Sequence, residues 1–191
     1  HCEKVFSIFE PHVEWNNKGK AKGVELGHNT LIVTDQYHFI LHHEVYEKKV
    51  DKKRTISIGN TIAQTFTAAD YELGSISFDR NFYSKLAKQS LDKQFYRVIL
   101  PKPVYQSKAQ VEEQSQADYV QKQKQHATVE ANIHQLEAHG LGVCRDKGID
   151  GFKRYVAYGV LAYNLHRLGN LIKRIEAQKQ ARRAKFRRTA A

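Results

Sequence analysis

A long segment without glycine or proline, residues 108–139, constrains the fold more than any other feature of this sequence. It consists mainly of Gln, Lys, Glu and Ala, which favour helix, and Gly140 is a typical helix stop. The segment therefore predicts one long helix. Its second half repeats Val129, Ile133 and Leu136 at helical spacing, so this face is expected to pack against the rest of the domain.

Short apolar runs precede this helix and alternate with helix-compatible stretches. Residues 31–33 and 39–41 flank a polar turn, which predicts a β-hairpin. The other expected elements are strands at residues 75–79 and 97–100 and helices at residues 56–69, 83–93 and 152–175. The last helix carries an apolar stripe that should dock on the domain, formed by Val156, Val160, Tyr163, Leu168, Leu171 and Ile175. The alternation of strands and helices predicts an α/β fold.

The charge balance points to a polyanionic partner. The chain has 31 Lys and Arg against 20 Asp and Glu, a net charge of +11, and nucleic acid is the first candidate partner. A merely basic surface is the alternative. No apolar run approaches the roughly 20 residues that span a bilayer. With only Cys2 and Cys144, no disulfide framework is indicated, so we expect a cytoplasmic protein without a membrane partner.

Two acids are candidate ligands of a divalent metal. Asp79 ends the apolar strand at residues 75–79, where a carboxylate can face a ligand while its neighbours stay buried. Glu130 lies in the long helix at the edge of the apolar stripe, on one face with His126, His134 and Glu137. Oxygen ligands of this kind suit Mg²⁺ or Mn²⁺. Most single helical glutamates are solvated, which is the alternative for Glu130.

Four stretches, in this order, resemble one protein family. They are residues 7–15 (SIFEPHVEW) with 18–20 and 25–27, residues 77–84 (SFDRNFYS), residues 125–133 (QHATVEANI), and residues 139–141, 148–155 and 164–168. They resemble the bacterial insertion-sequence transposases with a DDE catalytic domain, which have an RNase H-like fold and are related to retroviral integrases. Each motif alone is weak, but the shared order makes coincidence improbable.

The resemblance implies a fold, a reaction and a set of site residues. The fold would be a mixed β-sheet flanked by helices, with Asp79 and Glu130 as catalytic metal ligands. Two Mg²⁺ or Mn²⁺ ions would support phosphodiester hydrolysis and strand transfer at insertion-sequence ends. The partners would be terminal-repeat and target DNA and further copies of the chain, in the bacterial cytoplasm and nucleoid. The residues expected to contact DNA are Lys18, Lys20, Arg80, His126, Lys179, Arg182 and Arg183.

The sequence also departs from the family pattern. Asn81 replaces a glycine, and His126 and Glu137 stand where related groups have Arg and Lys. The family's first aspartate precedes the segment at residues 7–15, so it is expected upstream of this sequence, which also contains no methionine. Asp35, Glu10 and Asp51 are poor substitutes. Residues 1–177 are therefore interpreted as a partial catalytic domain, inactive alone, followed by a basic tail at 178–191 that is a frayed helix or an extended end.

Two other functions remain open. His126, Glu130 and His134, to which His42 and His43 could add, have the residue types of a zinc hydrolase site. Alternatively, the chain is a non-enzymatic DNA-binding remnant. In that case residues 48–54 and 179–188 would hold phosphate, and the aromatic side chains available for base stacking are Trp15, Tyr37 and Tyr83.

Overall fold

The computed structural model describes residues 7–16, 25–46, 52, 54–102, 105 and 107–189, with side chains up to Phe186. The chain forms two compact units. The first comprises His1–Leu31 and Glu44–Ile133, and the second comprises Ile32–His43 and His134–Ala191. The predicted mixed α/β class is confirmed. Among the described residues, however, the strands form three separate two-stranded sheets.

The strands are β1 (Glu14–Asn16), β2 (Glu25–Gly27), β3 (Thr30–Thr34), β4 (Ile40–Val45), β5 (Ser75–Ser77) and β6 (Arg97–Ile99). The helices are α1 (Arg54–Thr67), α2 (Lys85–Leu91), α3 (Lys108–Ser115), α4 (Ala117–Leu136) and α5 (Gly148–Thr189), with short turns η1 (Arg80–Phe82) and η2 (Glu137–Leu141). β1 pairs antiparallel with β2, and β3 pairs with β4 as the predicted hairpin.

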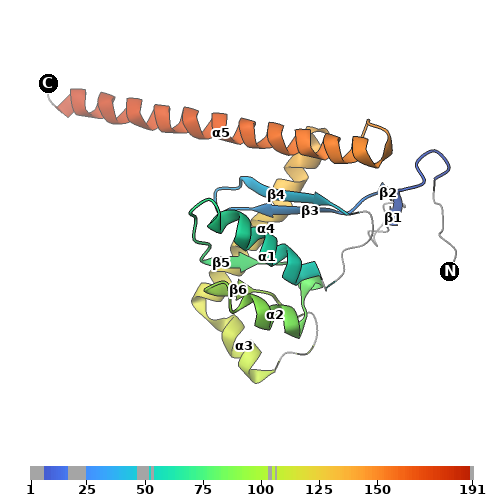
Figure 1. Cartoon of the computed structure of the whole chain (residues 1–191). Coiled ribbons are helices and arrows are strands. Elements are labelled where there is room, and N and C mark those ends of the chain that lie inside the picture. The colour runs from blue at the N-terminus through green and yellow to red at the C-terminus, as the bar shows by residue number, and fades with distance from the viewer. Residues whose placement is uncertain are drawn as a thin grey trace. The chain divides into compact units, whose positions relative to one another are not determined.

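The core of the first unit is built around the parallel pair β5 and β6. Ile76 is the register partner of Val98, and Figure 1 shows α1 and α2 beside these strands. The fully apolar interior consists of side chains from both strands and the surrounding helices: Ile58, Ile62, Phe78, Ala87, Leu91, Phe95, Val98, Ile99, Leu100 and Tyr119. Burial of these side chains is the main source of stability in this unit.

Lys88 connects three elements of the first unit through its ammonium group. Its Nζ donates to Asp92 Oδ1 at 2.9 Å in the turn after α2 and to the Val98 carbonyl at 3.0 Å in β6. It also donates to Glu113 Oε1 at 3.1 Å in α3. Three acceptors satisfy the three donors of a lysine ammonium, which allows this side chain to lie partly buried.

The long helix predicted for residues 108–139 is broken. It consists of α3 and α4, because Gln116 between them has an extended ψ of 136°. The Arg97 guanidinium donates to the Gln116 side chain and lies 3.2 Å from Asp118 Oδ2, and Tyr119 is buried one turn into α4. The single-helix prediction was therefore wrong at Gln116, where tertiary contacts outweigh helix propensity. The stop at Gly140 agrees with its positive φ of 110°.

In the second unit, side chains of α5 form hydrogen bonds with the backbone at the tip of the hairpin. The Asn164 side-chain amide donates to the Ile40 carbonyl at 2.8 Å and accepts from the Ile40 N–H at 2.9 Å. Arg167 Nε donates to the Tyr37 carbonyl at 2.7 Å. The Asn164 amide therefore replaces a β-ladder partner for this edge residue. Val156, Val160 and Tyr163 are buried on this side of the helix.

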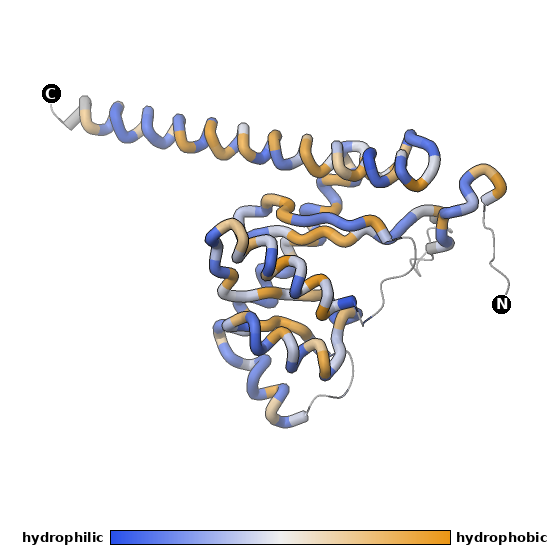
Figure 2. Tube along the Cα trace, in the orientation of Figure 1, coloured by the Kyte–Doolittle hydropathy of each residue, from blue (hydrophilic) through white to orange (hydrophobic). Residues whose placement is uncertain are grey.

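Helix α5 differs from its prediction in length and in the exposure of its stripe. It runs without interruption to Thr189, so residues 178–189 are helical, although they are rich in Arg and Lys. Figure 2 shows hydrophobic residues recurring along this helix. Val156, Val160 and Tyr163 are buried as expected, but Leu168 and Ile175 are exposed. The docking prediction was wrong for these two because they lie on another face.

Gly59 in α1 provides a test of the packing between α1 and α2. A Cβ at Gly59 would overlap the Cδ2 of Leu91, which is fully buried. Gly59→Ala should therefore destabilise the protein by about 1–3 kcal/mol, although alanine at an open helix site stabilises by up to about 1 kcal/mol. The measurement is the free energy of unfolding in urea. Thr61→Ala, at an exposed position of the same helix, is the matched control, and equal effects of the two changes would contradict this packing.

Candidate active site

Asp79 occupies the turn that follows β5 and caps η1. Its Oδ1 accepts from the Arg80 N–H at 2.7 Å, and its Oδ2 accepts from the Asn81 side-chain amide at 3.3 Å. The carboxylate is exposed. Each oxygen keeps a further lone pair, so both remain available to a cation. The Asn81 side chain thus supports the Asp79 carboxylate directly.

The backbone of this turn is held by buried neighbours. The N–H of Phe78 donates to the Ile99 carbonyl at 2.9 Å, which continues the contact between β5 and β6 up to Asp79. The Thr55 hydroxyl, fully buried at the start of α1, donates to the Phe82 carbonyl at 2.8 Å. The Phe78 and Phe82 rings lie 5.6 Å apart. Asp79 is therefore an exposed acid on a backbone fixed from both sides.

Helix α4 brings His126 and Glu130 into the same unit as Asp79. His126 is half-buried, whereas Glu130, one turn further along the helix, is exposed. The side of the helix that packs inward contains Tyr119, Asn132 and Leu136. Ile133, expected in the buried stripe, is exposed, so that part of the stripe prediction was wrong. Compared with the predicted stripe, the buried residues of α4 include Asn132 in place of Ile133.

The His126 ring interacts electrostatically with both acids. Burial lowers the pKa of His126 below its usual 6.5, and the negative charges of Asp79 and Glu130 act in the opposite direction. Both acids are therefore close enough to His126 for their charges to act on its ring, and all three residues belong to the first unit.

The set of side chains expected to hold a divalent metal is incomplete among the described residues. Within the described residues no group of three or more His, Cys, Asp or Glu side chains is arranged to hold a metal ion. Two carboxylates are present, and the resemblance implies that a third belongs to the site. Oxygen donors that are exposed and partly hydrogen-bonded fit Mg²⁺ or Mn²⁺ in their chemistry.

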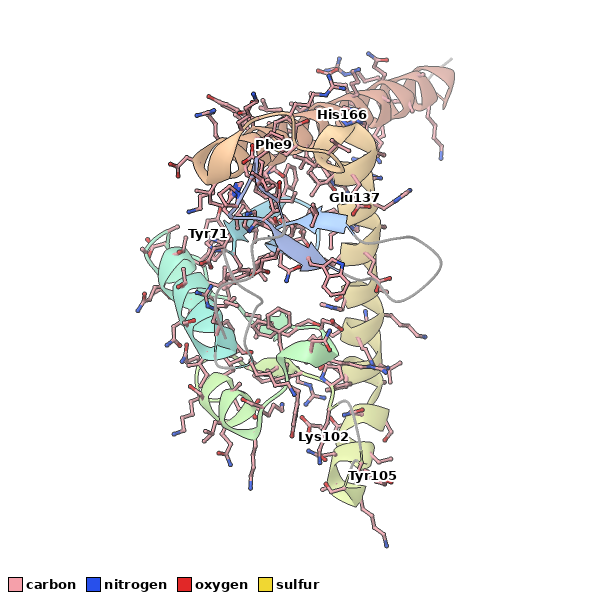
Figure 3. The ribbon with its side chains drawn as sticks, turned by 90° about the vertical axis from the view of Figure 1, so that its right-hand side faces the viewer. Phe9, Tyr71, Lys102, Tyr105, Glu137 and His166 are labelled. Atoms are coloured by element: carbon pink, nitrogen blue, oxygen red, sulfur yellow. The ribbon has the colours of Figure 1, made fainter. Side chains whose placement is uncertain are left out.

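The zinc alternative is not supported by the described side chains. His126, Glu130 and His134 follow one another at four-residue intervals along α4, whereas His42 and His43 lie in β4. The described ranges contain no cluster of three such ligands. A zinc hydrolase site needs three protein ligands and one open position. Glu137, which was predicted to share a helix face with His126, Glu130 and His134, lies beyond α4, in η2 (Figure 3).

The other predicted site residues are distributed along the chain. Arg80 is exposed next to Asp79. Lys179, Arg182 and Arg183 are exposed on α5 in the second unit. Lys18 and Lys20, like most of the basic loop at residues 48–54, lie outside the described residues, as does Asp51.

Asp35 is confirmed as a turn residue. Its Oδ1 accepts from the N–H groups of Tyr37 and Phe39, both at 2.8 Å, in the loop of the β3–β4 hairpin. This is the side-chain arrangement that makes Asp common in turns. Of the aromatic residues considered for base stacking, Trp15 and Tyr37 are exposed.

An edge-to-face contact between two histidine rings was not anticipated from the sequence. The His12 and His28 rings lie 5.0 Å apart at 60° in the first unit. His28 is buried and donates from Nδ1 to the Tyr46 carbonyl at 3.0 Å, while His12 Nδ1 lies 3.5 Å from Glu10 Oε2. The sequence analysis predicted neither β1 nor β2, which follow His12 and precede His28, and periodicity does not indicate which strands come together.

No protein-family model matches the chain, and no curated protein or solved structure matches it significantly. None of the helices in the described part of the chain is both long and apolar enough to cross a membrane.

The buried imidazole predicts a pH dependence of stability. Because folding lowers the pKa of His126, the unfolded chain binds more protons just below pH 6.5, so stability falls as the pH drops through this range. His126→Gln should remove this part of the loss. The measurement is the urea midpoint at about pH 7.5 and about pH 5.5.

Two further variants control this experiment. His134→Gln, at an exposed position of α4, should keep the wild-type pH dependence. Burial and the neighbouring His42 charge lower the pKa of His43, so His43→Gln should remove a separate part of the loss. An unchanged pH dependence in His126→Gln would show that this imidazole is not desolvated by folding.

Proposed function

We propose that this chain is the catalytic part of a DNA transposase of the DDE type, with an RNase H-like organisation and Asp79 and Glu130 as two of its metal ligands. The observation that carries the proposal is the joint electrostatic interaction of both acids with His126 in one unit. The proposed reaction requires the two carboxylates to lie close enough to share metal ions, and their common action on one imidazole supports this.

The chemistry assigned to the site follows from its donors. Divalent metal ions held by the two carboxylates would activate the attacking water or 3′-hydroxyl and stabilise the leaving oxygen during displacement at phosphorus. Asp79 contributes a ligand on a backbone that is held on both sides, because the Phe78 N–H and the Phe82 carbonyl are both hydrogen-bonded. Asn81 orients the same carboxylate through its side-chain amide. Arg80 offers a cation next to the metal ligand, where it can hold a DNA phosphate.

His126 has a distinct role in this proposal. Related groups carry Arg or Lys at this position, as the resemblance implies, whereas a half-buried imidazole with a lowered pKa is largely neutral at pH 7. A neutral imidazole can donate a hydrogen bond to a phosphate or to one of the carboxylates without adding a full charge. We therefore assign His126 to positioning of the two acids and of the DNA backbone.

Metal binding provides the direct test of the two acids. Asp79→Asn and Glu130→Gln should each weaken Mn²⁺ binding by about tenfold or more, measured by titration calorimetry on the chain as it stands. Glu72→Gln, an exposed acid elsewhere in the first unit, is the control and should bind like wild type. Wild-type affinity in both site variants would contradict the assignment.

Catalysis is tested on a protein extended upstream, since the first aspartate is expected there. Mn²⁺-dependent nicking of supercoiled plasmid should appear in the extended protein and be lost in Asp79→Asn. Nicking that survives this change would separate the activity from the proposed site. DNA binding without any nicking, with or without the extension, would favour the non-enzymatic DNA-binding remnant.

The basic end of α5 predicts a salt dependence of DNA binding. Arg182→Gln/Arg183→Gln removes two exposed cations with little change in helix propensity. If both contact phosphate, the slope of log K against log salt should become shallower by about 1.8. Fluorescence anisotropy with duplex DNA measures this slope. Lys85→Gln/Lys93→Gln removes two exposed cations near α2 and should leave it unchanged.

A further inference from the structure

The second unit contains a small cavity between the last turn of α4, η2 and α5. Its volume is about 150 Å³. This is more than the ~10–15 Å³ that one water needs and less than the ~300 Å³ of sites for drug-sized ligands, so it fits a small ion or the end group of a larger molecule. We call it the α5 cavity. Polar side chains line it: Gln135, His139, Tyr163, His166, Arg167 and Asn170.

The lining of the α5 cavity is suited to a negative ligand. Arg167 carries a permanent positive charge, and His139 and His166 become positive on protonation. The side-chain amides of Gln135 and Asn170 have N–H groups to donate. No Asp or Glu is among the described residues that line the cavity. Such a lining attracts an anion, whereas the arginine would repel a metal ion.

Arg167 has hydrogen-bonding capacity that the described part of the chain does not use. The side chain is half-buried, and its Nε donates to the Tyr37 carbonyl at 2.7 Å. Its two Nη groups have no hydrogen-bond partner among the described residues, and none of their acids forms an ion pair with it. Guanidinium groups are seldom withdrawn from water without an opposite charge. The bond from Nε also orients the planar fork, as bidentate binding of a phosphate requires.

The two histidines of the α5 cavity provide further donors. Their rings, His139 and His166, lie 5.8 Å apart at 69°. The Asn170 amide nitrogen lies 3.2 Å from His166 Nε2. Because an amide nitrogen only donates, Nε2 is the acceptor and His166 keeps an N–H at Nδ1. No described residue forms a hydrogen bond with His139. Each ring therefore retains an N–H donor for a ligand.

Two acids of the second unit lie near the α5 cavity without lining it. Burial raises the pKa of Tyr163, the charge of Arg167 lowers it and the charge of Asp35 raises it, so both charges act close to this wall. Asp35 accepts two backbone N–H groups in the hairpin turn. Glu137 lines a neighbouring hollow. Asp35 therefore weakens the positive potential of the cavity but does not occupy the Arg167 fork.

We propose that the α5 cavity binds a phosphate group of the DNA backbone, with Arg167 as a bidentate donor and His139 and His166 as further donors. None of these three residues is among the predicted DNA contacts. An anion with several oxygens is the ligand that donors from three side chains can share in so small a space.

The surroundings of the α5 cavity favour a phosphate that is part of a strand. Gln135, His139, His166 and Asn170 are exposed, so a phosphate that remains attached to DNA can reach the cavity. Three and four residues beyond Asn170, on the same side of α5, two more exposed cations follow: Lys173 and Arg174. DNA as the source of the phosphate rests on the proposed function, whereas the affinity of the cavity for phosphate does not.

Histidine-ring NMR of the full chain, titrated with inorganic phosphate at constant pH and ionic strength, tests the site. The signals of His139 and His166 should shift to saturation with a Kd on the order of 1 mM. Arg167→Gln should weaken this binding by about tenfold or more, because the fork is lost. Arg174→Gln, which removes the same charge from an exposed position of the same helix, is the control and should bind phosphate like wild type.

A second variant separates binding from folding, because Arg167 also contacts the hairpin backbone. His139→Gln changes an exposed side chain, so its circular dichroism spectrum should match that of wild type. Its phosphate affinity should fall by about threefold, the effect of one lost hydrogen bond. Wild-type affinity in both Arg167→Gln and His139→Gln would overturn the proposal, as would the absence of saturable shifts. Saturation of the two rings by Zn²⁺ in place of phosphate would also overturn it.

Duplex DNA distinguishes the two sources of phosphate. A short duplex should shift the signals of His139 and His166 itself, and inorganic phosphate should then change them no further. Phosphate binding that is unaffected by DNA would overturn the DNA part of the proposal and assign the cavity to free phosphate. The proposed catalytic function fails separately, through nicking that is absent or independent of Asp79, and the NMR titrations do not depend on nicking.

Discussion

The parallel pairing of β5 with β6 is the constraint on which the first unit depends. It buries Val98 and Ile99 between helices and extends through the Phe78 N–H to the residue before Asp79. The strand must then leave the core, and the turn that follows is fixed by the Thr55 hydroxyl. An acid at this point is exposed without being mobile. The position of the Asp79 carboxylate therefore depends on the short stretch of backbone hydrogen bonds between β5 and β6, in which no charged group takes part.

Helix α4 shows how tertiary contacts adjust a strong local preference. The break at Gln116 allows Arg97 to reach both Gln116 and Asp118 while Tyr119 enters the core. The helix that follows presents His126 toward the interior and leaves Glu130 in solvent. Burial disfavours the protonated imidazole, and the charges of Asp79 and Glu130 favour it. Burial is the larger effect, so the pKa of His126 is lowered and the ring is mostly uncharged at neutral pH.

The two sides of helix α5 differ in their surroundings. The Asn164 amide and the Arg167 guanidinium bind hairpin backbone on one side, where hydrogen bonds as well as apolar burial fix the contact. The opposite side has only the spacing of a coiled-coil helix, and the helix continues into a strongly basic end.

The sequence by itself determined the local elements of this protein, because alternation, helical spacing and turn residues act over a few positions. It located the hairpin, the turn role of Asp35, the strand before Asp79 and both long helical regions. It did not determine that the strands form separate pairs, that Gln116 breaks a helix, or that Asn132 is buried in place of Ile133. The sequence also did not predict that His126 interacts electrostatically with both Asp79 and Glu130. Periodicity shows that a face is apolar but not what covers it, so only contacts between distant segments decided these features.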